Sequence, residues 1–391
     1  MDEILAQLAA AGIPAYGSSI TALDAYRGLR PAPIRFALAE CSLQDLARLF
    51  EKLEYPALPY ADAALGLGPE DAESGPGTLY LRCAESAKAA EPAAFAPLDL
   101  LATPRRRWFL DPKEVRPTLR EPRLAMRPAP AETQLFEAAV LLARQPYELE
   151  PGAAPPLPRD FPPRAERDLL TLVLTGPTPD RALELLREIG FVDAYWPELA
   201  ALSGVGQSKE FHPEGDAWAH TMETFRHRKQ PSLRLSLALL LHDAGKPAAE
   251  SAEGRRFDRH AEIGRSVAER FMRRLGFAPS LVDDVAFLVR YHMMPAALPR
   301  LPANRLEGVV DDPRFPILLE LYKCDELSTF RGPDGYYESC AAYRAYLRNA
   351  RNPWRDASGK KLALAWLADS PGRPASGGGR RPAGARSGRR R

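Results

Sequence analysis

The chain is 391 residues long, which is enough for two or three domains with cores of their own. Its hydrophobic fraction of 45% and charged fraction of 27% are ordinary for a globular protein, and no apolar run approaches the ~20 residues of a membrane helix. The four scattered cysteines form no CxxC pair, which argues against a disulfide framework, and we expect a cytoplasmic protein without a membrane partner.

Residues 1–125 mix short helical and strand-like segments. The N-terminal segment MDEILAQLAAAGI predicts a short amphipathic helix, and its two acids are not typical of a signal peptide. A second helix is predicted in SLQDLARLFEKL at 42–53, with Ser42 as its N-cap. The alternating segments GTLYLRCAE at 77–85 and RRWFLDP at 106–112 predict strands.

The middle and the C-terminal half of the chain are predicted to be mainly helical. After a proline-rich connection at 112–130, the apolar residues of ETQLFEAAVLLARQ at 132–145 follow a helical period. A second proline cluster at 151–163 separates that helix from further helical segments. Beyond Gly204 the pattern predicts one helix after another to about residue 367.

The C-terminal tail at 369–391 differs from the rest of the chain in charge. Residues 371–391 carry seven arginines and no acid, and removing those seven charges from the formal net charge of +2 leaves −5 for the rest. Their Gly/Pro/Ser/Arg composition cannot build a core, so we expect a disordered tail. Such a tail either aids solubility or binds an RNA backbone weakly and in a salt-sensitive way.

All six histidines lie in one region, between residues 212 and 292. Four of them and two aspartates fall on predicted helices or at helix ends, and these six are the candidate metal ligands: His220, His242, Asp243, His260, His292 and Asp325. A lone His–Asp pair means little, and a histidine on an apolar helix face is often a core residue bonded to a backbone carbonyl. The ordered set of six favours ligands over that alternative.

His242 and Asp243 follow the apolar run LRLSLALLL, which must be buried on most sides. A buried carboxylate without a partner is very costly, and a divalent cation would offset its charge. Adjacent helical residues point about 100° apart, so both side chains can approach one ion at the helix edge. With His220 and Asp325, they would form a four-ligand site of imidazole nitrogens and carboxylate oxygens.

His260 and His292 are predicted to hold a second ion, bridged to the first by Asp243, or to contact a phosphate. Lys246, three residues after Asp243, is placed to meet a substrate phosphate or the leaving oxygen. We therefore take Asp243 and Lys246 as the candidate catalytic residues. One or two ions of Mg²⁺, Mn²⁺, Ni²⁺ or Fe²⁺ are compatible with these ligands, and the sequence does not choose among them.

The order of these ligands, in the context HDAGKP, resembles the HD superfamily of metal phosphohydrolases. The segment FHPEGDAWAHT at 211–221 resembles the start of the HD domain in bacterial tRNA nucleotidyltransferases and poly(A) polymerases. In that segment His212, Glu214 and Asp216 are expected to form a capped turn before the helix of His220. The segments 137–151 and 181–202 are similar to helical parts of the same family, so the resemblance spans roughly residues 5–345.

The resemblance implies an α+β fold in four parts. A small mixed α/β nucleotidyltransferase-like head is expected at 1–125, and an all-α linker of RNA-binding type at 126–205. An all-α HD domain is expected at 206–368, followed by the disordered arginine-rich tail at 369–391.

The head departs from the family at its catalytic positions. Of the family's Gly-Gly and Arg-Asp pairs in the first strand–helix turn, only Asp24 remains. The family's Asp-x-Asp, which binds two magnesium ions, falls on Pro33 and Arg35, and an arginine would repel a cation. Phe95 persists from a later family motif, but the polar residues around it are gone. We therefore expect a head that has lost its polymerising site.

The resemblance implies a metal-dependent phosphomonoesterase or phosphodiesterase that acts on phosphorylated small molecules, nucleotides or RNA ends. It favours 2′,3′-cyclic phosphates, 2′-nucleotides or 3′-terminal phosphates as substrates. One alternative is a tRNA nucleotidyltransferase or poly(A) polymerase-type enzyme with a displaced carboxylate site. Another is a non-catalytic adaptor that binds RNA through the head, the helical region and the arginine-rich tail.

Overall fold

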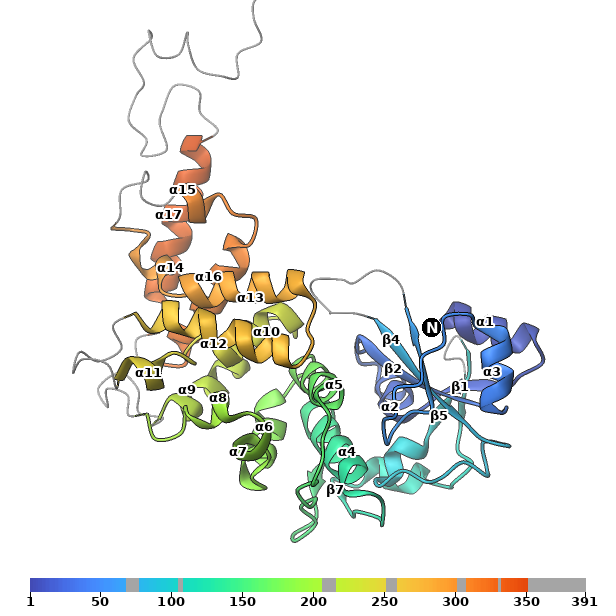
Figure 1. Ribbon diagram of the computed structural model, residues 1–391. Helices are drawn as coiled ribbons and strands as arrows, with labels where there is room; N and C mark the ends of the chain where they lie inside the picture. The colour runs from blue at the N-terminus through green and yellow to red at the C-terminus, as the bar shows by residue number, and fades with distance from the viewer. Residues whose placement is uncertain are drawn as a thin grey trace, which may run out of the picture.

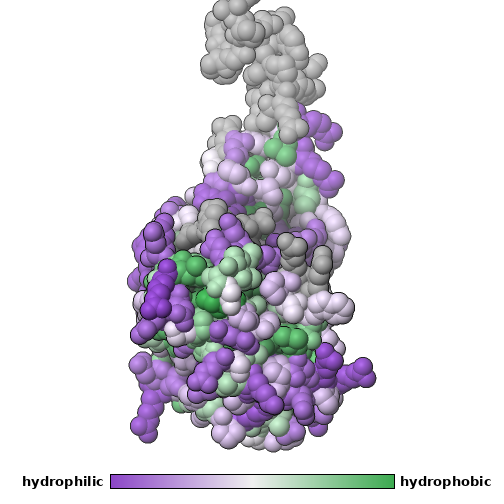
Figure 2. Space-filling view, turned by 90° about the vertical axis from the view of Figure 1, so that its right-hand side faces the viewer, coloured by the Kyte–Doolittle hydropathy of each residue, from purple (hydrophilic) through white to green (hydrophobic). Residues whose placement is uncertain are grey.

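A computed structural model describes residues 1–67, 77–104, 108–205, 216–250, 259–300, 307–329 and 332–350. Several expectations from the sequence fall outside these residues: His212, Glu214, the helical pattern expected at 351–367 and the arginine-rich tail. Seen from the side of the head, hydrophilic residues cover most of the surface and hydrophobic ones gather in small groups (Figure 2). None of the helices in the described ranges combines the length and the apolar character needed to cross a bilayer.

The N-terminal head is a mixed sheet with helices packed on it (Figure 1). Its helices are α1 (Asp2–Ala10), α2 (Ser19–Arg27) and α3 (Leu43–Leu49). Its strands are β1 (Ala15–Gly17), β2 (Ile34–Ala39), β3 (Ala63–Gly66), β4 (Thr78–Cys83), β5 (Leu101–Ala102) and β6 (Phe109–Leu110). The strand order is β3-β4-β2-β1-β5-β6, with β2 and β4 parallel and the other neighbours antiparallel.

The predicted elements of the head are confirmed, with shorter bounds. Helix α3 begins after Ser42, whose hydroxyl accepts from the backbone N–H of Asp45 while the Asp45 carboxylate accepts from the N–H of Ser42. This reciprocal pair satisfies two donors that a helix start otherwise leaves open. The strand expected at 77–85 is β4, and the one expected at 106–112 is reduced to the two residues of β6.

The side chains of β2 alternate between two cores on opposite faces of the sheet. Ile34 and Phe36 belong to the main core, which includes α2 and continues into the helical part. Ala37 and Ala39 belong to a smaller core with Leu5 and other residues of α1 and α3. By the same alternation Arg35 lies on the face of α1, and its charge, after burial, lowers the pKa of the N-terminal amine.

Helix α4 (Ala131–Arg144) joins the head to the rest of the chain and confirms the helix expected at 132–145. It is buried on nearly all sides, between the sheet and the following helices. Before it lie the 3₁₀ helices η1 (Ala96–Asp99) and η3 (Arg116–Arg120) and strand β7 (Arg123–Leu124), which pairs in parallel with β8 (Glu148–Leu149). Four more helices follow: α5 (Pro163–Leu174), α6 (Pro179–Glu188), α7 (Phe191–Tyr195) and α8 (Pro197–Ala200).

The described C-terminal part is all helical, as expected (Figure 1). Its first helices are α9 (Ala217–Thr224), η4 (Phe225–His227), α10 (Leu233–Leu241), α11 (Lys246–Glu250) and α12 (His260–Arg274). The later ones are α13 (Pro279–Tyr291), α14 (Met294–Ala297), α15 (Glu307–Val310), α16 (Phe315–Leu327) and α17 (Asp334–Ala350). Helix α10 packs against α5, α9, α13 and α16, so its C-terminal end lies inside this bundle.

Candidate metal centre

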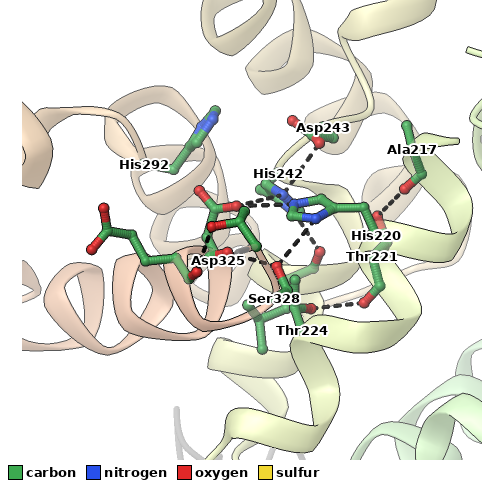
Figure 3. Close-up of polar contacts among 12 residues, drawn as sticks. Ala217, His220, Thr221, Thr224, His242, Asp243, His292, Asp325 and Ser328 are labelled. Atoms are coloured by element: carbon green, nitrogen blue, oxygen red, sulfur yellow. Dashed lines mark hydrogen bonds and ion pairs between the residues drawn. The ribbon is translucent and has the colours of Figure 1, made fainter. Parts of the chain in front are cut away.

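Five helices bring the six candidate ligands together. Figure 3 shows five of these residues: His220, His242, Asp243, His292 and Asp325. Helix α10 is apolar over its last turns and buried, so the residues that follow it, His242 and Asp243, enter the interior with only 1% and 2% exposure. His220 comes from α9, whose start is capped by Asp216 through a bond from the N–H of Ala219. The other three come from α12, α13 and α16: His260 opens α12, His292 follows α13, and Asp325 lies near the end of α16.

The first group of potential ligands is His220, His242 and Asp325. His220 Nε2 lies 2.9 Å from Asp325 Oδ1, and His242 Nε2 lies 3.9 Å from the same oxygen. The second group is Asp243, His260 and His292. The Nε2 atoms of His260 and His292 are 3.1 Å apart, and His260 Nε2 lies 3.9 Å from Asp243 Oδ1.

The two groups meet at the His242–Asp243 pair. His242 Nε2 is 3.4 Å from Asp243 Oδ2, although the two residues fall into different groups. The prediction placed Asp243 with the first ion and as a bridge to the second. In the structure Asp243 Oδ2 lies 3.4 Å from His242 Nε2 and Asp243 Oδ1 lies 3.9 Å from His260 Nε2, an arrangement that suits a bridging carboxylate.

Backbone carbonyls fix which ring nitrogen of the buried histidines carries the proton. His242 Nδ1 lies 2.7 Å from the carbonyl oxygen of Leu239, and His292 Nδ1 lies 2.7 Å from that of Val289. A carbonyl only accepts, so each Nδ1 is the protonated nitrogen. In each neutral ring, Nε2 then carries a lone pair directed at the centre of the site. A neutral imidazole with a free lone pair is the form of histidine that binds metals.

Ser328 fixes Nδ1 as the protonated nitrogen of His220, as the backbone carbonyls do for His242 and His292. Ser328 is not among the residues predicted from the sequence. The Ser328 hydroxyl donates to the carbonyl of Asp325 at 2.6 Å, so its oxygen accepts from His220 Nδ1 at 3.1 Å (Figure 3). The signal in the sequence was its position three residues after Asp325, one turn further along the chain. A serine there is not recognisable as a partner of His220 until the two helices are brought together.

This arrangement leaves acceptor atoms facing one another, which is the chemistry of a cation site. The His220 Nε2 lone pair faces a carboxylate oxygen at 2.9 Å. His242 Nε2 is buried and makes no hydrogen bond with any described residue. Unsatisfied buried groups of this kind cost free energy, and a divalent ion bound by nitrogen and oxygen would relieve them. The residues present therefore fit such an ion.

The charge states agree with this interpretation. Burial, followed by the charge of neighbouring histidines, lowers the pKa of His292 to about 4, and burial also lowers the pKa of His242. Both rings are therefore neutral near pH 7, with their lone pairs available. Burial alone would raise the pKa of Asp243, but His242 and Lys246 outweigh it and hold the pKa well below its usual value. Burial would also raise the pKa of Asp325, but the contact with His220 outweighs it and lowers the pKa, so Asp325 is ionised.

Lys246 and Gly245 complete the turn after the His–Asp pair. Lys246 Nζ lies 2.6 Å from Asp243 Oδ2, so it supplies the nearest positive charge to the site. Gly245 allows α12 to approach, because a Cβ on Gly245 would lie 2.0 Å from the carbonyl oxygen of His260. By contrast, the half-buried His227 lies outside the site, and its Nε2 is 3.6 Å from a carboxylate oxygen of Glu223.

The head does not show a comparable site. Asp24, the one residue retained from the family's first motif, is 2% exposed and forms an ion pair of 2.7 Å with Arg144 of α4. Its other oxygen accepts from Gln145 at 2.8 Å, so Asp24 links α2 to α4. Within the described part of the head, no group of three or more potential metal ligands is present.

Comparisons with known proteins bear on the HD part and on the overall fold. Residues 218–314 match the sequence profile of the family described as "HD domain", a range that contains five of the candidate ligands and ends before Asp325. The chain is 42% identical over 123 residues to the "Multifunctional CCA protein" of Halorhodospira halophila, which is 31% of this chain and 29% of that protein. It is 37% identical over 150 residues to the "CC-adding tRNA nucleotidyltransferase" of Thermus thermophilus, which is 36% of this chain and 33% of that protein.

The matched segments thus span about a third of these curated relatives. A solved structure extends the similarity over the whole fold. The CCA-adding enzyme of Bacillus stearothermophilus in complex with CTP aligns with a TM-score of 0.51 at 16% identity, covering 94% of this chain and 88% of that chain. The chain therefore contains an HD domain, and its overall fold is that of the CCA-adding tRNA nucleotidyltransferases that its sequence motifs resemble.

Proposed function

We propose that the chain is a metal-dependent phosphohydrolase whose HD site cleaves phosphate esters of nucleotides or RNA ends. The observation that supports this most strongly is the pair of His/Asp groups at the end of α10, in which the Nε2 lone pairs of His242 and His292 are set by backbone carbonyls. Rings set in this way need not turn to bind a cation, and phosphoryl transfer needs mainly charge neutralisation and positioning.

In this proposal His220, His242 and Asp325 hold one ion, and Asp243, His260 and His292 hold a second. A bound divalent ion supplies positive charge for the phosphate and lowers the pKa of a water molecule towards neutrality. Ser328 and the carbonyls of Leu239 and Val289 keep the histidine rings in place. Lys246, whose ammonium lies against Asp243 Oδ2, would be placed to bind a phosphate oxygen or the leaving oxygen beside such an ion.

A second candidate is a tRNA nucleotidyltransferase, and the comparisons favour it. The two curated relatives carry names of that activity, and the solved structure with the same fold is a CCA-adding enzyme bound to CTP. Against it stand Pro33 and Arg35 at the positions where the resemblance places the metal-binding carboxylates. By the alternation of β2, Arg35 also lies on the sheet face that packs against α1.

The deciding experiment measures both activities in the same preparations. Phosphate release is followed on a panel of nucleotides, 2′,3′-cyclic nucleotides and 3′-phosphorylated RNA with Mn²⁺ or Ni²⁺. In parallel, labelled CTP and ATP are offered with tRNA and Mg²⁺. We expect metal-dependent phosphate release that falls by at least about 100-fold in the His242→Ala/Asp243→Ala variant, because removing ligands costs more than the 10–100-fold typical of groups that only orient them.

The matched control is His227→Ala, which removes a histidine of the same helical bundle that lies outside the site. It should keep both bound metal and turnover. Label incorporation into tRNA without phosphate release would establish the nucleotidyltransferase instead. The hydrolase proposal is wrong if no substrate is turned over and elemental analysis finds no metal in the wild-type protein.

A further inference from the structure

A cavity of about 480 Å³ lies in the head, away from the HD site. Its walls come from β2, β4 and η1, and from the face of α4 that is turned to the sheet. This volume is in the range of pockets that enclose small organic molecules. The cavity takes no part in the function proposed above.

Two polar side chains of α4 lie one helical turn apart at the cavity wall, Thr133 and Glu137. The Thr133 hydroxyl oxygen is buried and has no hydrogen-bond partner among the residues that the structure describes. Glu137 Oε2 accepts from the backbone N–H of Phe95 at 3.3 Å. Buried polar groups are normally satisfied, so this part of the wall is suited to a polar ligand.

Glu137 is held as a neutral acid in the empty cavity. Burial raises the pKa of Glu137 to about 8, against the opposing effects of the Phe95 and Ala94 backbone bonds and of the Arg82 charge. Asp99, which faces Glu137 from η1, raises the pKa further. The charged groups that act most strongly on this carboxyl are thus one cation from β4 and one anion from η1. A positive charge brought next to Glu137 would ionise it.

Aromatic rings form the apolar part of the wall: Phe36, Tyr60 and Phe136. Tyr60 and Phe136 stack with 4.1 Å between ring centroids, and Phe36 meets Tyr60 edge-on at 6.1 Å. The Tyr60 hydroxyl donates to Asp168 of α5 at 3.2 Å, so its polar end is already engaged. Aromatic faces attract cations and exclude water, which strengthens a nearby ion pair.

Acids outnumber bases around the cavity. Its lining holds two basic side chains, and each already donates to a backbone carbonyl: Arg82 to Pro59 at 3.2 Å and Lys113 to Lys88 at 2.8 Å. The acidic side chains of the lining are Asp62, Glu85, Glu91, Asp99 and Glu137, of which Asp99 is paired with Arg127. This balance favours a cation over a triphosphate anion.

We propose that the head cavity binds a small organic cation, an amine or a guanidine, whose charged group pairs with the Glu137 carboxylate and whose apolar part packs on Phe36, Tyr60 and Phe136. Thr133 accepts a second hydrogen bond from the same group. The site is non-covalent. At pH 7 the entering cation displaces the proton of Glu137, which passes to the buffer, so that the cavity exchanges a proton for the ligand.

The test is isothermal titration of the full chain with agmatine and with benzamidine at pH 7. Two buffers with different ionisation enthalpies report the proton count, which should approach one released per ligand bound, as a carboxyl with a pKa near 8 requires. Glu137→Gln, which keeps the shape of the neutral acid, should weaken binding by at least about 10-fold and abolish proton release. Glu132→Gln, on the same helix and outside the cavity lining, is the matched control and should leave both unchanged.

A second variant tests the same site independently, in case Glu137→Gln does not fold. Thr133→Val replaces the hydroxyl with a methyl group of similar size and should weaken binding without altering the proton count. The proposal is overturned if neither cation binds wild type, if Glu137→Gln binds as wild type does, or if CTP with Mg²⁺ occupies the cavity in preference to both cations.

Discussion

At the scale of single residues, Ser328 is the sharpest test of how the metal centre is built. Its hydroxyl lies between His220 Nδ1 and the carbonyl of Asp325, so it fixes both the tautomer and the angle of that ring. Groups that orient a metal-binding histidine are typically worth 10–100-fold in metal affinity. We expect Ser328→Ala to weaken metal binding by about that factor, measured by competition with a chromophoric chelator.

Ser280→Ala, at an exposed position of α13, is the control for loss of a helical serine and should bind metal as wild type does. An unchanged metal affinity in Ser328→Ala would mean that Asp325 alone holds His220, through the contact of 2.9 Å. In that case the ring would need no second partner, and the tautomer of His220 would be set by the ion.

At the scale of elements, the close approach of α12 to the turn after α10 depends on Gly245. An alanine Cβ would lie 2.0 Å from the carbonyl oxygen of His260 and 2.5 Å from the backbone nitrogen of Gly264. Backbone atoms cannot yield as a flexible side chain does, so α12 must move, and His260 moves with it. We expect Gly245→Ala to lower the free energy of unfolding by about 1–3 kcal/mol and to weaken metal binding.

Urea denaturation with and without Mn²⁺ measures both effects. The control is Gly308→Ala in α15, where a Cβ would meet nothing within 4 Å. That change should be neutral or stabilising by up to about 1 kcal/mol, because alanine favours a helix over glycine. If Gly245→Ala were as well tolerated as Gly308→Ala, the packing of α12 would not position His260.

Elements defined by local pattern could be predicted from the sequence, and those defined by distant partners could not. Helix α3 follows from Ser42 and Asp45 three residues apart, and α4 follows from its apolar period. Strands β5 and β6 have two residues each, too few for a period to fix their bounds, which depend on the pairing of β5 with β1 and of β6 with β5. The burial expected at the end of α10, together with the ordered set of histidines and aspartates, predicted His242 and Asp243 as candidate ligands.

The same limit applies to the sites. The six candidate ligands were visible because histidines are few and lie in one region. Ser328 and Gly245 act through contacts with residues of other helices, and their places in the chain, three residues after Asp325 and two after Asp243, do not reveal those contacts. The head cavity was also missed, because Glu137 and Thr133 were read as part of an apolar helix. Their role follows from the sheet that packs on α4.

At the scale of the whole molecule, one continuous core runs from α2 in the head to α16 in the HD part. Buried residues of helices α4 and α5 belong to this core, and the two helices lie between the head and the HD part in Figure 1. Polar bonds follow the same path: the hydroxyls of Tyr60 and Tyr80 both donate to Asp168 of α5. A head without a polymerising site would still be retained as a structural part of such a molecule, because removing it would expose this core.

The ion pair of Asp24 with Arg144 tests that continuity, because it joins α2 to α4 with both side chains only 2% exposed. Replacing one partner leaves a buried charge uncompensated, which typically costs about 3–5 kcal/mol. We expect Asp24→Asn to reduce the free energy of unfolding by that order in urea, as a single transition that includes the HD part. Glu148→Gln is the control, since it removes the exposed pair with Arg123 and should cost less than about 1 kcal/mol. If Asp24→Asn instead unfolded the head alone and left metal binding at the HD site unchanged in the same urea range, the two parts would be independent folding units, and the retained Asp24 would serve only the head.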